Sequence, residues 1–528
     1  MKHPVRLKLQ PLGNTLALER GAWLRDVLFA QGVEFPCGGR GRCKGCRVKV
    51  LAGVLPITAD DARLLDAREL SEGWRLSCQA RAEGDLSLDL AQWEATILAD
   101  NSTFDFTPRD GLGVAIDLGT TTLAGQLLDL RTGHVLAVGT GLNAQALHGA
   151  DILSRIDYAR HHGGQPVLER LIRGQISGLI GELLGAASAT PGALRDVVLV
   201  GNTAMHHLFC GLDITPLAAH PFEPATDAVQ LFTAKELGWR ESSGAVGLTG
   251  IAPETRVRFL PGLGSFVGSD LLAGVLATRM HEQPALTVLV DLGTNGEIVV
   301  GNRDRLLCAS TAAGPAFEGA RISCGMRAAT GAISEVTVAE GRLECRVLGH
   351  TAARGICGSG LVDAVACALD LGLVQPDGKL ANGGNLALAP SVSLLQADIR
   401  ELQLAKGAIA AGIRILLRQW GATDDDVHRV WLAGAFGNYI NRASARRIGL
   451  IDFPPENVLP AGNTALLGAK LALFNLPSEA GAYEAIRSRT QHVPLNEDPQ
   501  FMAIYVDEMA FPVGAPESAT PDLAGQPV

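Results

Sequence analysis

The sequence predicts an α/β body of two similar lobes that face each other across a cleft, preceded by a small β-rich domain. Three observations predict this fold class: the apolar pattern changes near Val114, one turn motif occurs twice after that point, and four cysteines gather before it. At 528 residues the chain is also too long for one core, and its length suggests three to four domains.

Residues 1–92 are predicted to form the first domain. Val5, Leu7 and Leu9 alternate with polar residues, a turn follows at 11–14, and the alternation resumes, which is typical of a β-hairpin. A short helix at 22–30 and a Gly- and Cys-rich loop follow. Further strands are expected over residues 46–51, 74–79 and 86–90.

Residues 93–110 lose this periodicity and are predicted to be a linker. Buried strands then alternate with helical segments, which indicates α/β layers. We assign the first lobe to residues 111–280 and the second to residues 281–512. The end of the chain, residues 513–528, is rich in Pro, Ala and Gly and is predicted to be disordered.

The net charge of -10 and the scattered Lys and Arg residues provide no basic stripe for nucleic acid. An apolar run of roughly 18 residues, as a membrane span requires, is absent from the sequence. The N-terminus lacks the pattern of a signal peptide, so we expect a cytoplasmic protein. In that compartment the ten cysteines are expected to be metal ligands or buried thiols rather than disulfides.

Four cysteines, Cys37, Cys43, Cys46 and Cys78, follow the spacing C-x5-C-x2-C-x31-C. A 2Fe-2S cluster needs four thiolates, and glycines let a loop approach it closely. Zinc is the alternative, but zinc ribbons usually show two close Cys pairs rather than a triplet and a singlet. The remaining cysteines stand singly and are expected to be buried small side chains: Cys210, Cys308, Cys324, Cys345, Cys357 and Cys367.

Each half of the body contains a buried strand that ends in an Asp-Leu-Gly-Thr turn, at Asp117 and at Asp291. The small residues of such a turn expose backbone N–H groups to phosphate oxygens, and the Asp can hold Mg²⁺ through water. The predicted nucleotide-binding residues in these turns are Gly119, Thr120, Thr121, Thr122, Gly293, Thr294 and Asn295.

Other glycine-rich segments extend this prediction. Gly358, Ser359 and Gly360 precede a helical pattern and suit an anion or nucleotide site, although an ordinary helix start would explain them too. Gly434 and Gly437 belong to a Gly-Ala-Phe-Gly turn after a later strand. The sequence Gly-Asn-Thr occurs at 201–203 and again at 462–464, and a helix cap would explain either copy.

The catalytic residues we predict are Asp117, Asp291 and Glu297. Glu297 follows the second turn and can orient water or Mg²⁺. A structural hydrogen-bond acceptor is the alternative for a lone carboxylate such as Glu297.

Together, the turns resemble the phosphate-1, phosphate-2 and adenosine motifs of the superfamily of actin, hexokinase-type kinases and heat-shock ATPases. This resemblance implies two actin-like (ribonuclease H-like) lobes that bind ATP and Mg²⁺ between them. The cysteine loop is similar to that of adrenodoxin-type ferredoxins, which implies a β-grasp 2Fe-2S domain.

A ferredoxin domain ahead of such a body resembles the reductive activators of corrinoid-dependent enzymes. The segments that carry this resemblance, besides the four cysteines, are residues 114–122, 149–156, 201–207, 291–297, 314–319 and 432–438. It implies ATP-dependent one-electron reduction of Co(II) to Co(I) in a corrinoid protein, with a reduced ferredoxin or flavoprotein as electron donor, and a homodimer. The stretch 220–260 contains no motif that we can use.

Three alternatives stay open at this point. One is an activator of a radical acyl-CoA dehydratase or reductase, although those proteins hold one 4Fe-4S cluster between two subunits. Another is a small-molecule kinase with a redox-sensing domain, for which Asp270 is the candidate catalytic residue. The third is an electron-transfer adaptor whose ATPase body is silent.

Overall fold

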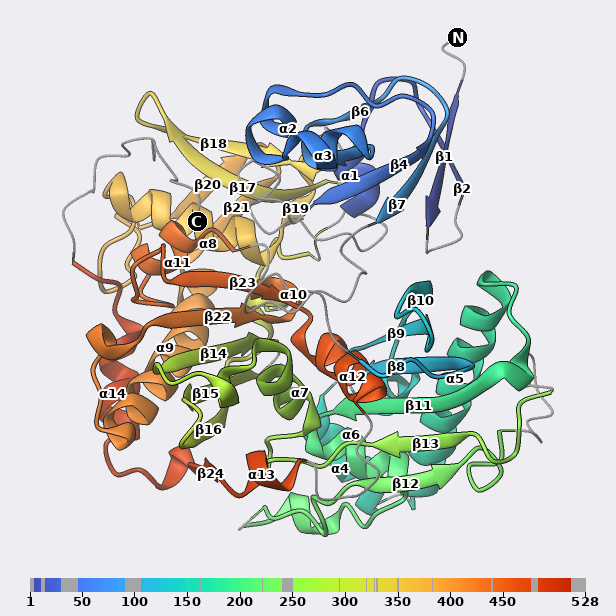
Figure 1. Cartoon of the computed structure of the whole chain (residues 1–528). Coiled ribbons are helices and arrows are strands. Elements are labelled where there is room, and N and C mark those ends of the chain that lie inside the picture. Colours follow the sequence, from blue (N-terminus) through green and yellow to red (C-terminus); the bar gives the residue numbers. More distant parts are fainter. Residues whose placement is uncertain are drawn as a thin grey trace.

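The structure is a computed structural model and describes most of the chain. The described residues are 4–10, 15–29, 46–90, 106–149, 151–161, 163–220, 222–239, 250–293, 295–319, 321–326, 328, 331–348, 351–381, 383–437, 440–475 and 483–513. Figure 1 shows the N-terminal domain in blue and, apart from it, two larger sheets with two helices between them. Among the described helices, each is too short or too polar to cross a membrane.

The N-terminal domain is built on a five-stranded mixed sheet in the order β2-β1-β7-β4-β5, in which β1 runs parallel to β7. Its strands are β1 (Val5–Gln10), β2 (Thr15–Leu18), β4 (Arg47–Ala52), β5 (Trp74–Leu76) and β7 (Leu86–Leu90), with β3 (Ala22–Trp23) paired to β6 (Arg81–Ala82). Three short helices complete it: α1 (Leu24–Phe29), α2 (Ala59–Leu64) and α3 (Ala67–Ser71).

The predicted hairpin is confirmed, because β1 pairs antiparallel with β2 and its apolar residues face the core. Two boundaries differ from the prediction. The helix begins at Leu24, since Ala22 and Trp23 pair with β6 instead. The strand expected over 74–79 ends at Leu76, and a 3-10 turn, Ser77–Gln79, carries Cys78.

The first lobe contains a six-stranded sheet in the order β10-β9-β8-β11-β13-β12. Strands β8, β9 and β10 form an antiparallel meander, and β8, β11 and β13 run parallel. Its strands are β8 (Leu112–Leu118), β9 (Thr122–Asp129), β10 (Val135–Leu142), β11 (Leu194–Gly201), β12 (Gln230–Thr233) and β13 (Arg256–Phe259). The outer face is covered by α4 (Ile152–His161), α5 (Gln165–Ala186) and α6 (Thr203–Cys210).

The second lobe repeats this plan with a sheet in the order β23-β22-β14-β15-β16-β24, so the predicted repeat is confirmed. A meander is again followed by a parallel strand, β22 beside β14. Its strands are β14 (Thr287–Leu292), β15 (Gly296–Gly301), β16 (Leu306–Thr311), β22 (Arg429–Ala433), β23 (Val458–Gly462) and β24 (Thr490–His492). This lobe also contains the helices α8 (Gly358–Asp370), α9 (Gln396–Trp420), α10 (Gly434–Gly437), α11 (Arg442–Arg447), α13 (Glu484–Arg487) and α14 (Phe501–Met509). Its outer strands are β17 (Ala332–Ala339), β18 (Arg342–Val347), β19 (Gly355–Ile356), β20 (Asn385–Ala389) and β21 (Val392–Leu395).

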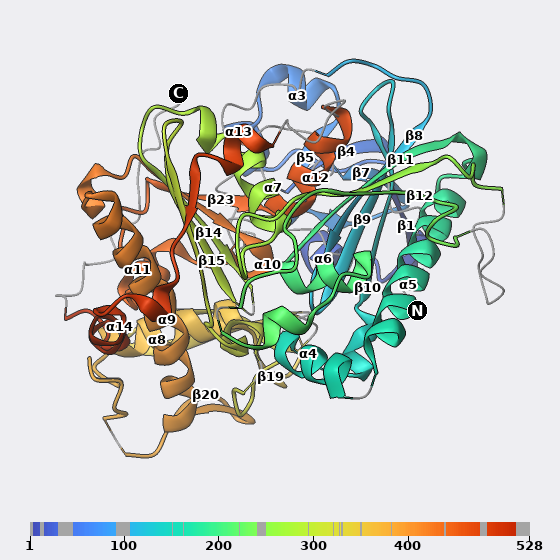
Figure 2. The same cartoon turned by 90° about the horizontal axis from the view of Figure 1, so that it is seen from below.

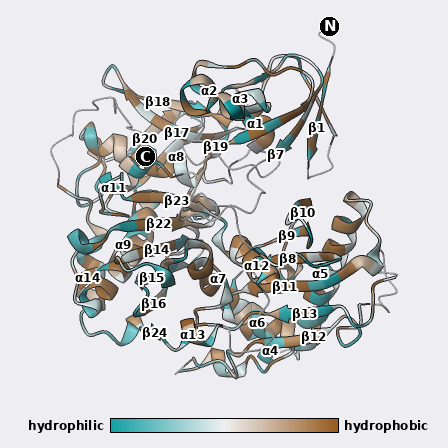
Figure 3. Ribbon diagram, in the orientation of Figure 1, coloured by the Kyte–Doolittle hydropathy of each residue, from teal (hydrophilic) through white to brown (hydrophobic). Residues whose placement is uncertain are grey.

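Two helices, α7 (Ser269–Thr278) and α12 (Thr464–Phe474), lie between the two sheets (Figures 1 and 2). They are apolar on nearly all sides, as their brown colour in Figure 3 shows. The faces that the two sheets turn toward these helices contribute Ala115 and Val198 from one lobe and Leu289 and Val299 from the other. We call this shared set of buried residues the inter-lobe core. It joins the lobes, because α7 comes from the first lobe and α12 lies between β23 and β24 of the second.

Much of the predicted linker and nearly all of the predicted tail lie outside the described residues, and the domain boundaries stay predictions.

Candidate functional site

The carboxylates predicted to be catalytic lie on the faces that the two sheets turn toward each other. Asp291 on β14 stands opposite Glu297 on β15, and Glu297 stands opposite Ser310 on β16. Directly opposed residues share one face of a sheet, and this is the face of the inter-lobe core. Asp117 follows Ala115 by two residues on β8 and therefore faces the same core from the other lobe.

A fourth carboxylate, Asp270, joins these three from the first turn of α7. The helix starts against the end of β11, because the Ser269 hydroxyl donates to the Gly201 carbonyl (3.1 Å) and the Gly201 N–H donates back to that hydroxyl. A Cβ at Gly268 would come within 2.3 Å of the Gly201 carbonyl, so only glycine permits this close approach. We call Asp117, Asp270, Asp291 and Glu297 the carboxylate cluster.

The four carboxyl groups repel one another in surroundings that are poor in water. Burial raises the pKa of Asp117 to about 6 and those of Asp270 and Asp291 to about 7. Burial, followed by the charges of Asp270 and Asp291, also raises the pKa of Glu297 well above its usual value. Yet each of these side chains is partly accessible, so solutes can reach the cluster. Such a cluster attracts a cation, which would replace protons near neutral pH.

The donor set fits a hydrated magnesium ion better than a directly ligated metal. Within the part of the chain that the structure describes, no three His, Cys, Asp or Glu side chains converge closely enough to hold a metal directly. Magnesium usually keeps several of its waters and uses one or two carboxylates. Oxygen donors that surround a cation through water match that habit.

The first Asp-Leu-Gly-Thr turn, which begins at Asp117, is held in place by side-chain hydrogen bonds. The Gly119 N–H donates to the Thr122 carbonyl (3.0 Å), which closes the turn. The Asn143 amide donates to the Gly119 carbonyl (2.9 Å), and the Asn202 amide donates to the Thr120 hydroxyl (2.8 Å). Asn202 also caps α6 by accepting from the Met205 N–H, so the predicted helix cap has a second contact in this turn.

Arg155 supports the same turn from behind. Its guanidinium is fully buried and donates to the Thr120 carbonyl (2.6 Å) and to the Gly149 carbonyl (2.9 Å). Burial lowers its pKa to about 10, so the group stays protonated at neutral pH. The sequence motif at 149–156 did not predict a role for Arg155, because its contact with Thr120 depends on how α4 packs.

The second turn is approached by backbone rather than by side chains. The Gly293 N–H donates to the Asn295 carbonyl (3.0 Å), while Thr294 lies outside the described residues. Gly434 has a φ of +83°, and a Cβ there would come within 2.6 Å of an Asp291 carboxylate oxygen. The Gly-Ala-Phe-Gly turn therefore lies directly against the second turn.

The segment Gly358-Ser359-Gly360 is buried where α8 begins. A Cβ at Gly358 would come within 1.9 Å of the Phe317 carbonyl, and one at Gly360 within 2.2 Å of the Ile333 carbonyl. These glycines thus have a packing role, and their contact with nucleotide stays a prediction. Next to them, Phe317 and Phe436 stack with ring centroids 4.6 Å apart.

In the N-terminal domain, two of the four cysteines predicted to bind the 2Fe-2S cluster come together. The register of β4 and β5 places Arg47 opposite Leu76, so Cys46 comes beside the turn that carries Cys78. The backbone N–H and the hydroxyl of Ser77 both donate to the Cys46 carbonyl, at 3.1 and 2.9 Å.

Cys46 and Cys78 are 2% and 1% exposed, which fits thiolates shielded from water. This fit does not separate iron from zinc. Cys37 and Cys43 lie outside the described residues.

Comparisons with known proteins agree with this layout. Residues 7–83 match the family described as 2Fe-2S iron-sulfur cluster binding domain, residues 112–283 the RACo middle region, and residues 285–520 the C-terminal domain of RACo, the ASKHA domain. The chain is 35% identical over 454 residues to the corrinoid activation enzyme RamQ of Eubacterium limosum, covering 79% of this chain and 74% of that one. The chain belongs to the RACo family of corrinoid-protein activators.

Two further relatives are also named for corrinoid proteins. The Co(II) methylated amine-specific corrinoid protein reductase of Methanosarcina barkeri is 27% identical over 76% of this chain and 77% of its own. The solved structure of a reductive activator for corrinoid,iron-sulfur protein covers 96% of this chain and 98% of its own, with a TM-score of 0.67 and 26% identity. The predicted fold class, a ferredoxin domain ahead of an actin-like body, is therefore confirmed for this RACo family member.

The six remaining cysteines are less uniform than the sequence suggested. Cys210, Cys308 and Cys357 are buried as predicted, and burial raises the pKa of Cys308 to about 12. The prediction is wrong in degree for Cys324, Cys345 and Cys367, which are only partly covered. Cys345 lies on the small outer sheet of β17–β19, where less protein packs on it.

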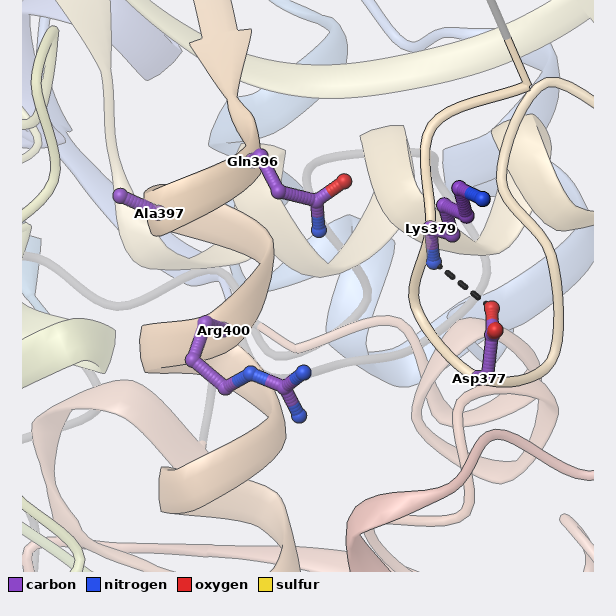
Figure 4. Close-up of a pocket in the computed structure, with 5 residues that line it drawn as sticks. All are labelled: Asp377, Lys379, Gln396, Ala397 and Arg400. Carbon is purple, nitrogen blue, oxygen red and sulfur yellow. Dashed lines mark hydrogen bonds between the residues drawn. The ribbon is translucent and has the colours of Figure 1, made fainter. Parts of the chain in front are cut away.

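An open pocket of about 440 Å³ lies elsewhere in the second lobe, where α9 begins (Figure 4). Asp377, Lys379, Gln396, Ala397 and Arg400 line it, and the Lys379 N–H donates to the Asp377 carboxylate (2.9 Å). It shares no residue with the carboxylate cluster, and its two cationic side chains are exposed. The carboxylate cluster therefore stays the candidate functional site.

Proposed function

We propose that this chain carries out ATP-dependent reductive activation of a corrinoid protein, in which one electron passes from a 2Fe-2S cluster to Co(II) and yields Co(I). The observation that carries the proposal is a cysteine-bearing β domain and a two-lobed body with a partly buried carboxylate cluster in one chain of the RACo family. The names of the relatives, which act on corrinoid proteins, support the same partner.

In the N-terminal domain, Cys37, Cys43, Cys46 and Cys78 would hold the cluster, which supplies a one-electron carrier. The chain's own contribution is a covered site. Cys46 and Cys78 belong to the apolar core that also contains Leu76 and Val48. A covered site restricts water and so affects the reduction potential.

In the body, the N–H groups of the two turns would receive the phosphates, with Asp117 and Asp291 orienting Mg²⁺ through water. The adenosine end would lie toward Gly434, Gly437 and the segment 358–360. Glu297 accepts a hydrogen bond from the Ser310 hydroxyl at 3.4 Å, which orients it. Burial and the charges of Asp270 and Asp291 raise the pKa of Glu297, so the ionised carboxylate is a stronger base than an exposed one, as a general base requires.

The need for ATP follows from the energetics of the transfer. For scale, the 2Fe-2S centres of plant-type ferredoxins lie at about -400 mV. The Co(II)/Co(I) couple is expected to be lower, and each ~59 mV uphill costs about tenfold in the one-electron equilibrium, ~1.4 kcal/mol. Nucleotide binding need only favour a docked state in which the cobalt is easier to reduce.

As partners we propose a corrinoid protein, a reduced ferredoxin or flavoprotein as electron donor, and a second copy of the chain in a homodimer. The match of residues 7–83 to a 2Fe-2S domain favours a corrinoid-protein activator over an activator that holds a 4Fe-4S cluster between two subunits.

The test mixes reduced protein and a Co(II) corrinoid protein anaerobically, with or without Mg-ATP, and follows the Co(I) absorption band. We expect Co(I) to accumulate far more with ATP. Cys43→Ser should abolish it, Asp291→Ala should remove the ATP effect, and Asp377→Asn, in the distant pocket, should behave as wild type. Equal Co(I) with and without ATP would contradict the proposal.

A kinase stays the second candidate because Asp270 lies in the carboxylate cluster with a pKa near 7, as the base for a hydroxyl acceptor would. Incubation with Mg-ATP and a panel of sugars tests it. Absence of any phosphorylated sugar removes this candidate, whereas a product that disappears in Asp270→Asn would favour it.

A further inference from the structure

Helix α12 has a functional feature at each end. The residue that caps its start contacts the carboxylate cluster, and its last two residues contact the segment that leads from the N-terminal domain. Its 11 residues span roughly 16 Å at about 1.5 Å per residue. One rigid element thus reaches from the proposed nucleotide site to the linker.

At the start of α12, the Asn463 side chain makes two hydrogen bonds at once. Its oxygen accepts from the Leu466 N–H (2.8 Å), which caps the helix, and its amide nitrogen donates to an Asp117 carboxylate oxygen (2.9 Å). The cap fixes the orientation of the amide, so the donor points at Asp117. The two residues are 346 positions apart and belong to opposite lobes.

At the end of α12, the linker is attached by an aromatic and a charged contact. Phe106 and Phe474 lie with ring centroids 4.5 Å apart. Arg109 donates to the Leu473 carbonyl (2.8 Å) and to the Asp196 carboxylate (2.7 Å). A cation at the last carbonyls of a helix is electrostatically favourable. The Arg109 N–H also donates to the Leu130 carbonyl, which fixes the linker to the first sheet.

Between its ends, α12 is packed too closely to bend or slip alone. A Cβ at Gly468 would come within 2.1 Å of the Ala273 carbonyl on α7, and one at Gly113 on β8 within 2.7 Å of the Leu473 side chain. Close-packed interiors respond to displacement as units rather than by local yielding. A shift at one end of α12 is therefore expected to appear at the other.

We infer that Asn463 is a positioning residue for Asp117 and that α12 couples the state of this carboxylate to the attachment of the linker at Phe106 and Arg109. The inference rests on the proposed function, because it concerns how a bound nucleotide changes the placement of the ferredoxin domain. When Mg-ATP engages Asp117, the Asn463 hydrogen bond changes, α12 moves with its cap, and the Leu473 and Phe474 contacts move with α12.

The test is hydrogen exchange on the full chain, with and without Mg²⁺ and a non-hydrolysable ATP analogue. In wild type we expect the nucleotide to change exchange several-fold in peptides covering residues 106–112. In Asn463→Ser, which keeps a capping oxygen but shortens the side chain that reaches Asp117, this distant change should disappear while calorimetry still detects nucleotide binding. The pH profile of that binding should also shift upward, since the amide of Asn463 holds down the pKa of Asp117.

Variants at the other end provide the matched pair. Arg109→Gln should retain ATP hydrolysis and lose most of the ATP stimulation of electron transfer. Arg131→Gln, which removes an exposed ion pair with Asp110 at the end of the same linker, should change neither. An unchanged linker in nucleotide-bound wild type, or a full linker response in Asn463→Ser, overturns the inference while the proposed function stands. Absence of nucleotide binding by wild type would instead overturn the proposed function together with the inference.

Discussion

The two Asp-Leu-Gly-Thr turns have the same sequence, but the protein holds them in different ways. Side-chain donors from Asn143, Asn202 and Arg155 surround the first turn. The second turn is instead approached by the backbone of Gly434, with less space than a Cβ needs. A polar network can lose one bond and weaken by steps, whereas a steric fit fails at once. The first turn should therefore tolerate substitution better than the second.

The largest effect is expected from Gly434→Ala. The left-handed backbone costs about 1–2 kcal/mol once a Cβ is present, and that Cβ would also displace Asp291. We predict that the affinity for Mg-ATP, measured by calorimetry, falls more than about a hundredfold, or ~3 kcal/mol. Gly421→Ala is the control, because Gly421 has a φ of +87° but open space around it. It should lower the melting temperature only, and an equal loss of affinity in both variants would refute the steric explanation.

The second largest loss of nucleotide affinity is expected from Arg155→Met. The substitution leaves the partly buried Thr120 and Gly149 carbonyls without their charged donor, a loss of about 1.5–3 kcal/mol. Nucleotide affinity should fall by roughly ten- to a hundredfold, with partial recovery in Arg155→Lys. Arg160→Met, exposed on the same helix, serves as the control. Wild-type affinity in Arg155→Met would show that the first turn does not depend on this network.

The pH dependence of stability probes the carboxylates that both turns share. Asp270 and Asp291 bind protons more tightly in the folded chain than in the unfolded one, with pKa values near 7 against 3.8. Their contribution to the free energy of unfolding is therefore fully present below about pH 4. It is lost as the pH rises through about 7.

Asp270→Asn should flatten this decline by about 1–2 kcal/mol in the nucleotide-free protein. Denaturant unfolding at pH 5 and pH 8 measures it. A decline as steep as that of wild type would mean that Asp270 is not part of the interacting set.

The smallest effect is expected from Asn202→Ser. Serine keeps a cap for α6 but cannot carry the amide to the Thr120 hydroxyl, which removes one neutral hydrogen bond worth about 1 kcal/mol. The affinity for Mg-ATP should fall about threefold to tenfold, with little change in melting temperature. A hundredfold loss of affinity would mean that the first turn tolerates substitution no better than the second.

The same comparison separates what the sequence could predict from what it could not. Asp117, Asp291 and Glu297 could be named as candidates because a buried strand ending in a glycine turn is a local pattern, and their catalytic role stays a prediction. Period-two alternation fixes which residues share a face of a sheet. The spacing assigned Cys46 and Cys78 to one set of four cysteines, and the β4–β5 register brings Cys46 beside the turn that carries Cys78.

Contacts between distant segments could not be predicted in this way. Asn463 reaches Asp117 across 346 residues, and Asp270 joins the cluster only because α7 starts against β11. The buried positions of α12 run round the helix, which gives no signal of the sheet it packs on. Gly358 and Gly360 show the opposite problem, because close packing and phosphate binding both favour glycine.

One measurement tests the central claim most directly. The pre-reduced chain is mixed anaerobically with a Co(II) corrinoid protein in the presence of Mg-ATP, a non-hydrolysable ATP analogue or no nucleotide, while iron content and Co(I) absorbance are recorded. We predict two iron atoms per chain for a 2Fe-2S cluster and far more Co(I) with Mg-ATP than without nucleotide. An iron-free protein, or Co(I) formed equally without nucleotide, would contradict the account.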